Sequence, residues 1–339
     1  MRCLIHIGSE KTGTSHLQCK MALSRKELLK SGLWFAKGAD FDEKCMTAGL
    51  ISGGNALKMA EDIEVDQWAR VLEQLQDCAQ EATRLKASSV VISSELLLRP
   101  LSSDGRLSRF MDALKQAGFS ESRFLLILRN PSTQLLSLYK HRAKNGTAGD
   151  LTQWCQTGYR LPQELAGIRD QADKTGATLL IRRYSRGEGK LDHMFFTDCL
   201  GVDVPEVEMS RTVNPSLTLS ELELIRQMAN RKPALVRFLY QHLASVPREH
   251  KVPCSLLEAH ALAVSEAVTC QHRDEWQRWN LRLPHDEALN IPDQAPEIPA
   301  FPRELGFSSQ QLAALSDFIE ESTRLRFLAR FFWETRLRP

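Results

Sequence analysis

Short apolar runs alternate with helical patterns along the first half of the chain. Four runs have the length and composition of buried strands: Cys3–Ile7, Val90–Ser94, Phe124–Leu128 and Ala177–Ile181. Between them, apolar residues recur with helical spacing, for example from Leu17 to Leu29 and from Trp68 to Leu85. Strands that alternate with helices favour a mainly parallel sheet covered on both faces. We therefore expect an α/β fold with a sheet of four or five strands and helices in the layers above and below it.

The second half of the chain is mainly helical in pattern. Helical spacing occurs at 151–175, broken around Gly158 and Pro162, and again at 219–245 and 255–282. Five prolines between 284 and 302 then indicate a long irregular connection. We expect residues 1–216 to form the α/β core and residues 217–339 to form a helical region that completes the domain. The sequence does not indicate a role for residues 231–308.

Two aromatic residues, Trp34 and Phe35, follow Gly32, where the first helical pattern ends. They open a less regular stretch that continues to Asn55. Contact with a substrate is one interpretation, but aromatic side chains in such a place more often fill the core. The last predicted helix, Gln310 to Trp333, also has an apolar face. We expect this face to pack against the core of the protein and prefer this interpretation to binding at a membrane surface.

Composition and charge exclude several classes of protein. The 339 residues carry 44 Lys and Arg against 42 Asp and Glu, so a net charge of +2 argues against a strongly electrostatic nucleic-acid binder. No apolar run approaches the length of a membrane span, and the first strand begins where a signal peptide would lie. The eight cysteines are scattered without a C-x-x-C pair, which favours reduced thiols. We expect a cytoplasmic protein without an integral membrane segment.

The segment Gly8–Ser15 joins the first strand to the first helix and has the composition of a phosphate-binding loop. A glycine-rich turn between a strand and a helix directs backbone N–H groups and the helix N-terminus toward one point, which suits an anion. Each helix terminus contributes only about 0.3–1 kcal/mol, so affinity also requires stacked amides and a cation.

The cation in this loop is displaced from the usual position. In the triphosphate loop G-x-x-x-x-G-K-[ST], Gly8 and Gly13 have the right spacing and Ser15 supplies the hydroxyl, but Thr14 stands where the Lys belongs. The nearby cation is Lys11, at the crown of the loop. Because a triphosphate enzyme needs its Lys on the β- and γ-phosphates, the displaced Lys indicates a shorter ligand, a 5′-phosphate that carries one more group.

A second candidate element follows the third apolar run. Arg129 ends this strand, and Pro131 suits the first position of a helix. Ser137 then lies nearly two turns into the helix, where its hydroxyl can meet a phosphate held by the planar Arg129 guanidinium. A strand-to-helix junction of this kind is common by itself, but it is specific in combination with the first loop.

These two elements together resemble those of a known enzyme family. The segment His6–Ser15 resembles the 5′-phosphosulfate loop of sulfotransferases that use 3′-phosphoadenosine-5′-phosphosulfate (PAPS), in the bacterial branch related to carbohydrate sulfotransferases. The segment Arg129–Tyr139 resembles the family's 3′-phosphate element, R-[ND]-P-x(5)-S-x-Y. The resemblance extends over roughly residues 1–216 and, loosely, the final helix. It implies a P-loop-type three-layer fold and a PAPS-dependent sulfotransferase that releases adenosine 3′,5′-bisphosphate (PAP).

The resemblance also implies roles for individual residues. Lys11 would stabilise the departing phosphate oxygen, and Arg129 and Ser137 would hold the 3′-phosphate. Arg211, near an N-x-S-L signature, is a weaker candidate for the 3′ side, because we favour helix initiation by a capping box at Thr218 and Glu221 as the explanation of that segment. No metal is required. The residues expected to hold the 5′-phosphosulfate are Ser9, Lys11, Thr12, Gly13, Thr14 and Ser15.

The base that removes the acceptor proton has three candidates. Glu95 lies just beyond the second strand, at the edge of the sheet where ligands of α/β proteins bind, and related carbohydrate sulfotransferases use Glu for this purpose. Glu95 can instead cap the following helix or pair with an Arg. His16 and His141 are the other candidates, each on a predicted helix. Tyr184, which ends the fourth strand, matches a family position, but the acidic residues that usually follow it are replaced by Ser185 and Arg186.

Two other classes of function stay open at this point. A nucleotide or sugar kinase has the same scaffold, although the displaced Lys11 and the lack of a Mg²⁺ carboxylate argue against it. A non-catalytic nucleotide-binding protein is the other alternative. The expected partners are PAPS and an acceptor hydroxyl: a carbohydrate is favoured by analogy, and a lipid, a phenol or a peptide side chain stays possible.

Overall fold

The computed structural model describes residues 1–185, 187, 189–207, 217–302 and 304–336, with side chains up to Arg324. Internal packing divides the chain into two compact units, each assembled from several segments. The first unit consists of Met1–Pro131, Arg160–Val213 and His272–Ile291, and the second of Ser132–Tyr159, Asn214–Gln271 and Pro292–Pro339. We call these the first unit and the second unit.

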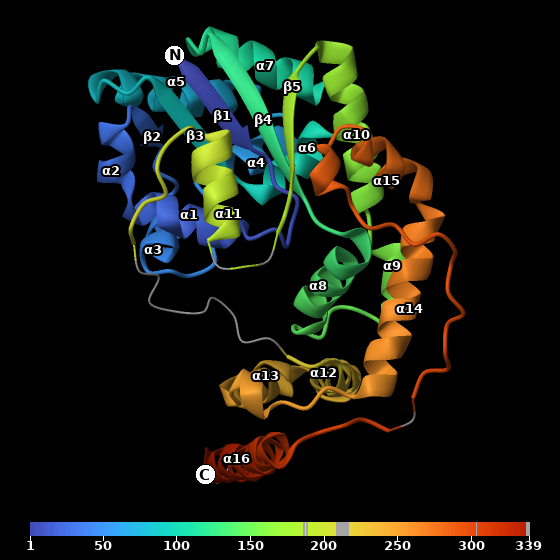
Figure 1. Cartoon of the computed structure of the whole chain (residues 1–339). Coiled ribbons are helices and arrows are strands. Elements are labelled where there is room, and N and C mark those ends of the chain that lie inside the picture. The colour runs from blue at the N-terminus through green and yellow to red at the C-terminus, as the bar shows by residue number, and fades with distance from the viewer. Residues whose placement is uncertain (186, 188, 208–216, 303, 337–339) are drawn as a thin grey trace. The chain divides into compact units, whose positions relative to one another are not determined.

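The first unit is built on a five-stranded sheet in the order β2-β3-β1-β4-β5 (Figure 1). Every pairing is parallel, which confirms the predicted α/β class. The strands are β1 (Arg2–His6), β2 (Leu33–Phe35), β3 (Ser89–Ser93), β4 (Glu121–Leu128) and β5 (Thr178–Arg183). Because β1 lies at the centre, the loop that follows it emerges between the carboxyl ends of β3 and β4.

The strand β2 is a correction to the sequence analysis, which assigned irregular structure to this stretch. Leu33 pairs with Ser89 and Phe35 with Val91, so this short strand forms one edge of the sheet. All three of its residues are buried, and Trp34 and Phe35 are 6% and 0% exposed. Both aromatics therefore fill the core, the interpretation that the sequence favoured.

One face of the sheet packs against helices from the N-terminal third of the chain and a π-helical turn. The helices are α1 (Thr14–Leu23), α2 (Arg25–Lys30) and α3 (Asp40–Thr47), and the turn spans His193–Cys199. Leu4, Val91 and Leu125 of the strands share a buried cluster with Met21 of α1 and Phe195 of the turn. This packing fixes α1, and with it the loop that precedes α1, against the central strand.

The other face is covered by α5 (Trp68–Arg84), α7 (Arg106–Gln116) and α10 (Leu161–Thr175), with α4 (Leu57–Glu64) and α6 (Leu98–Leu101) beside them (Figure 1). The Phe110 ring of α7 packs against Phe124 of β4 at a centroid distance of 6.2 Å. The sheet therefore lies between two helical layers, as the sequence predicted.

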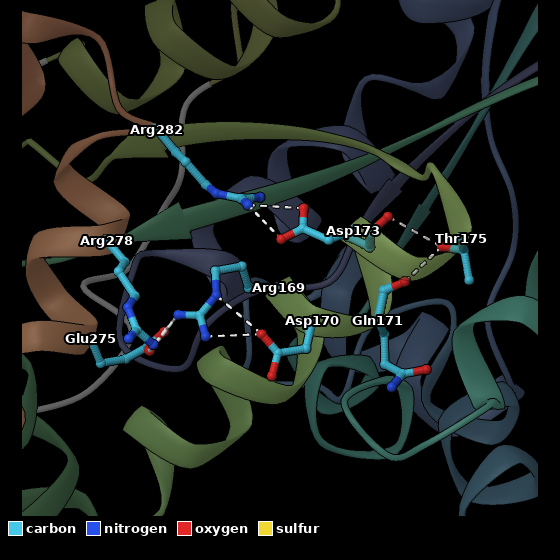
Figure 2. A network of polar contacts seen from close by, with 9 residues as sticks. Arg169, Asp170, Gln171, Asp173, Thr175, Glu275, Arg278 and Arg282 are labelled. Carbon is cyan, nitrogen blue, oxygen red and sulfur yellow. Dashed lines mark hydrogen bonds and ion pairs between the residues drawn. The ribbon is translucent and has the colours of Figure 1, made fainter.

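A polar network attaches α15 (Arg273–Asn280) to α10 within the first unit (Figure 2). The buried Arg169 of α10 binds the Glu275 carboxylate and also donates to Asp170 at 2.9 Å. Arg282 donates to Asp173 at 2.7 Å. The Arg282–Asp173 pair is half exposed, and exposed ion pairs contribute little to stability. We therefore assign the attachment of α15 to α10 chiefly to the buried Arg169–Glu275 pair.

The second unit is helical in its described part. It holds α8 (Pro131–Ala143) from Ser132 onward, α9 (Leu151–Thr157), α12 (Leu219–Arg231), α13 (Val236–Ser245), α14 (Ser255–Gln271) and α16 (Ser309–Arg336). The predicted capping box begins α12: the Glu221 N–H donates to Thr218 Oγ1 at 3.2 Å, and the Thr218 N–H donates to Glu221 Oε2 at 2.7 Å. Phe318 of α16 packs on Phe238 of α13 and is 4% exposed. No helix in the described residues is long and apolar enough to cross a lipid bilayer.

A buried histidine at the end of β1 predicts an acid-sensitive fold. His6 is fully buried, its Nδ1 lies 2.9 Å from Ser93 Oγ, and burial lowers the pKa of its imidazole from 6.5 to about 4. Between pH 6.5 and about 4 the unfolded chain binds this proton and the folded chain does not, so stability falls as the pH falls through that window. At about 1.4 kcal/mol for each pH unit, the loss reaches about 3 kcal/mol at pH 4.

The variant His6→Asn tests this prediction, since its amide can still reach Ser93 but does not titrate. We expect denaturant unfolding of the wild type to show a steeper loss of stability from pH 6.5 to 4 than the variant shows. Parallel pH profiles for the two proteins would contradict the assignment.

Candidate functional site

The loop between β1 and α1 has a backbone that requires glycine at two positions. Gly8 and Gly13 have φ angles of 77° and 84°. A Cβ at Gly8 would lie 2.6 Å from the Glu95 Cα, and a Cβ at Gly13 would lie 2.4 Å from Leu191 Cδ2. Lys11 shares the left-handed conformation with φ of 67°, which is uncommon for a residue with a side chain. Strained positions of this kind cluster at ligand sites.

Hydrogen bonds to β4 hold this loop in place. The N–H of Ile7 donates to Leu125 O at 3.0 Å, and the Ser9 hydroxyl donates to Ile127 O at 2.9 Å. The Thr12 hydroxyl donates to Ser9 O at 2.6 Å, and both hydroxyl residues are fully buried. Ser9 and Thr12 therefore use their side chains to shape the loop.

The N-terminus of α1 offers unused hydrogen-bond donors. The first helical N–H bond runs from Leu17 to Gly13 O, and no side chain caps the helix. The N–H groups of Thr14, Ser15 and His16 consequently have no partner within the helix. The Thr14 hydroxyl is also buried, and no described residue forms a hydrogen bond with it. These donors converge at the positive end of the helix dipole, which is suited to an anion.

The Arg129 side chain reaches the backbone at the crown of the loop. Arg129 follows β4 directly and is 8% exposed, and its Nη1 donates to the backbone carbonyl of Lys11 at 3.2 Å. The Arg129 guanidinium lies 5.5 Å from the centre of the Tyr184 ring, and Tyr184 also lies close to Gly13. The structure therefore brings the first loop and the start of the second sequence element together, although they are 118 residues apart.

Glu95 lies beside the same loop. It is half-buried and begins a short 3₁₀ turn, Glu95–Leu97, immediately after β3. The cap of this turn is Ser94, whose Oγ accepts from the Leu96 N–H at 3.2 Å. The alternative in which Glu95 caps the helix is therefore wrong. The close approach to Gly8 brings Glu95 to the edge of the loop.

Asp192 is a member of this site that the sequence analysis did not find. Its carboxylate binds His16 Nε2 at 2.7 Å through Oδ1 and Lys20 Nζ at 2.7 Å through Oδ2, and so attaches α11 (Lys190–Asp192) to α1. Burial alone would raise the pKa of Asp192, but the hydrogen bonds from His16 and Lys20 outweigh burial and hold it below its usual value. His16, one of the three candidate bases, thus contacts the Asp192 carboxylate through Nε2, and its side chain is 40% exposed.

Three predicted residues lie outside the described part of the first unit. Ser137 and the half-buried His141 lie on α8, in the second unit. Arg211 falls in 208–216, outside the described residues. Among the residues that are described, no three His, Cys, Asp or Glu side chains are arranged to hold a metal ion.

Comparison with known proteins adds one structural likeness. No protein-family profile and no curated protein matches the chain. The crystal structure of a sulfotransferase from Alicyclobacillus acidocaldarius is similar to it at a TM-score of 0.36 and 18% identity. The match covers 69% of this chain and 95% of that one.

Proposed function

We propose that this chain is a sulfotransferase that moves a sulfuryl group from PAPS to an acceptor hydroxyl. The observation that carries the proposal is the junction of Lys11 and Arg129: two cationic residues meet at an uncapped helix N-terminus, at the carboxyl end of a parallel sheet. Ligands of open α/β proteins bind at this edge. The sequence resemblance of both segments to the PAPS family supports the same proposal independently of the geometry.

In this proposal the loop holds the 5′ end of the donor. The amides of residues 11–15 and the hydroxyls of Thr14 and Ser15 bind the 5′-phosphosulfate, while Ser9 and Thr12 keep the loop in shape. Arg129 and Ser137 bind the 3′-phosphate, and Arg211 is a further candidate there. This second contact would distinguish PAPS from nucleotides that lack a 3′-phosphate.

The transfer step needs one base and one cation. Glu95 accepts the proton of the acceptor hydroxyl as its oxygen attacks sulfur, and the S–O bond to the 5′-phosphate breaks in line with that attack. Lys11 stabilises the negative charge that develops on the departing phosphate oxygen of PAP. We assign the base to Glu95, with His16 and His141 as the alternatives, because Glu95 directly follows β3 and lies against Gly8 of the loop. By resemblance, a carbohydrate hydroxyl is the favoured acceptor.

Ligand-dependent thermal stability and a transfer assay test this function together. A ligand at about 100 times its Kd stabilises a protein by about 2.7 kcal/mol, so we expect PAP to raise the Tm clearly and Mg-ATP to raise it less. Incubation with PAPS labelled in the sulfuryl group and fractionated host extracts should transfer the label to an acceptor. Stabilisation by Mg-ATP alone would indicate a kinase, and PAP binding without transfer to any fraction would indicate a non-catalytic protein.

A further inference from the structure

The second unit contains a cavity of its own. Its volume is about 310 Å³, near the lower end of the range for small-molecule sites, which begins at about 300 Å³. The wall residues come from α8, α9, α12, α14 and the connection around residue 301, and all of them belong to the second unit. None of the residues proposed to bind PAPS lines this cavity.

Part of the cavity wall is apolar. Leu219 of α12 and Leu257 and Ala261 of α14 are at most 5% exposed, and the Phe301 ring completes this part of the wall while 47% exposed. A wall of this composition accepts the hydrocarbon body of a ligand.

The charged groups of the wall sum to one negative charge. Arg226 donates to Glu223 through Nε at 2.8 Å and through Nη2 at 2.6 Å, so these two charges compensate each other. Asp150 is the third charged residue, and its Oδ1 accepts the Gln153 N–H at 2.9 Å as the N-cap of α9. An anionic ligand would meet these carboxylates without an uncompensated cation, so the charge balance favours a cationic ligand.

The neutral polar groups offer mainly acceptors. His260 Nδ1 lies 2.7 Å from the carbonyl of Pro299, and because a carbonyl only accepts, Nδ1–H is the donor. In the tautomer with its proton on Nδ1, the ring has a lone pair on Nε2, to which no described residue donates. The Tyr139 hydroxyl donates to Gly149 O at 3.3 Å, and burial raises the pKa of Tyr139, which keeps this hydroxyl protonated. These two groups therefore offer acceptors to a ligand's N–H or O–H donors, and the Thr152 hydroxyl in the same wall can accept as well as donate.

We propose that this cavity binds a small organic ammonium ion, a protonated amine on an apolar body, with Asp150 as its counter-ion and His260 Nε2 and the Tyr139 oxygen as further acceptors. The apolar wall holds the body of the amine. This site stands on the second unit alone and does not depend on the reaction proposed for the first unit.

Three probes of one shape test the charge preference on the full chain. They are 2-phenylethylammonium, neutral 2-phenylethanol and anionic 3-phenylpropionate, with Kd values measured by calorimetry or ligand-observed NMR. We expect the ammonium ion to bind at least about tenfold more tightly than the carboxylate, with the alcohol between them, because charge-assisted hydrogen bonds are the stronger ones. Equal affinities, the reverse order or no binding of the ammonium ion overturns the proposal.

Two variants locate the binding. Asp150→Asn removes the charge and keeps a good N-cap for α9. We expect this variant to bind the ammonium ion about tenfold more weakly and to bind the alcohol with unchanged affinity. Ala261→Leu fills the cavity and should abolish binding of all three probes. The control is Glu258→Gln, which removes a carboxylate on α14 that pairs with Lys140 at 3.5 Å outside the cavity wall. Wild-type affinity for the ammonium ion in Asp150→Asn or Ala261→Leu contradicts the assignment.

Discussion

Replacing Lys11 with alanine should lower the rate of sulfuryl transfer at least about tenfold, which corresponds to about 1.4 kcal/mol or more of barrier height. Lys11 lies at the crown of the loop, and in the proposed reaction its ammonium group stabilises the charge that develops on the departing phosphate oxygen. The substitution leaves the Lys11 backbone carbonyl in place, so the hydrogen bond from Arg129 Nη1 persists. We therefore expect the loss in kcat, with a smaller change in the affinity for PAP.

A matched control separates the charge from the fold. Lys115 is exposed in the last turn of α7, and Lys115→Ala should keep wild-type turnover. Lys11→Arg retains a cation at the crown and should retain more activity than Lys11→Ala. If Lys11→Ala turns over at the wild-type rate, Lys11 has no part in the mechanism.

Replacing Arg129 with alanine is expected to weaken PAP binding at least about tenfold, because the guanidinium is the charged fork that we assign to the 3′-phosphate. Calorimetry measures this directly. Arg123→Ala is the control: Arg123 lies on the same strand, pairs with Glu121 and is 58% exposed. Its removal should leave the affinity for PAP unchanged.

A comparison of two ligands separates the phosphate contact from a distorted loop. Arg129 also binds the Lys11 carbonyl, so its removal affects any ligand of the loop to some extent. Adenosine 5′-phosphate lacks the 3′-phosphate, and the wild type should bind PAP more tightly than this nucleotide. In Arg129→Ala that preference should disappear, which isolates the coupling between the side chain and the 3′-phosphate. An unchanged preference contradicts the assignment.

Much of the fold was predictable because most of its strands are self-contained apolar runs. The runs at β1, β3, β4 and β5 were each found within three residues of their observed bounds, and the break between α9 and α10 was found from Gly158 and Pro162. The strand β2 was missed because three apolar residues carry no periodicity, and its strand character comes from pairing with β3 more than fifty residues away. The interleaving of the two units along the chain depends on similarly distant contacts.

The candidate site was predictable where a local motif carries it. Lys11 and Arg129 stood out because each belongs to a short strand-to-helix junction, and parallel strands bring such junctions to one edge of the sheet. Asp192 has no motif around it, and its bond to His16 spans 176 residues. The packing of Tyr184 on Arg129 and the cavity of the second unit likewise arise from residues distant in the sequence.

The most direct test of the central claim is a crystal structure of the protein with PAP bound. We expect the 5′-phosphate on the amides of residues 11–15, with the Lys11 ammonium beside it. We expect the 3′-phosphate within hydrogen-bonding distance of the Arg129 guanidinium. A nucleotide bound elsewhere, or Lys11 and Arg129 side chains directed away from a common ligand, would contradict it.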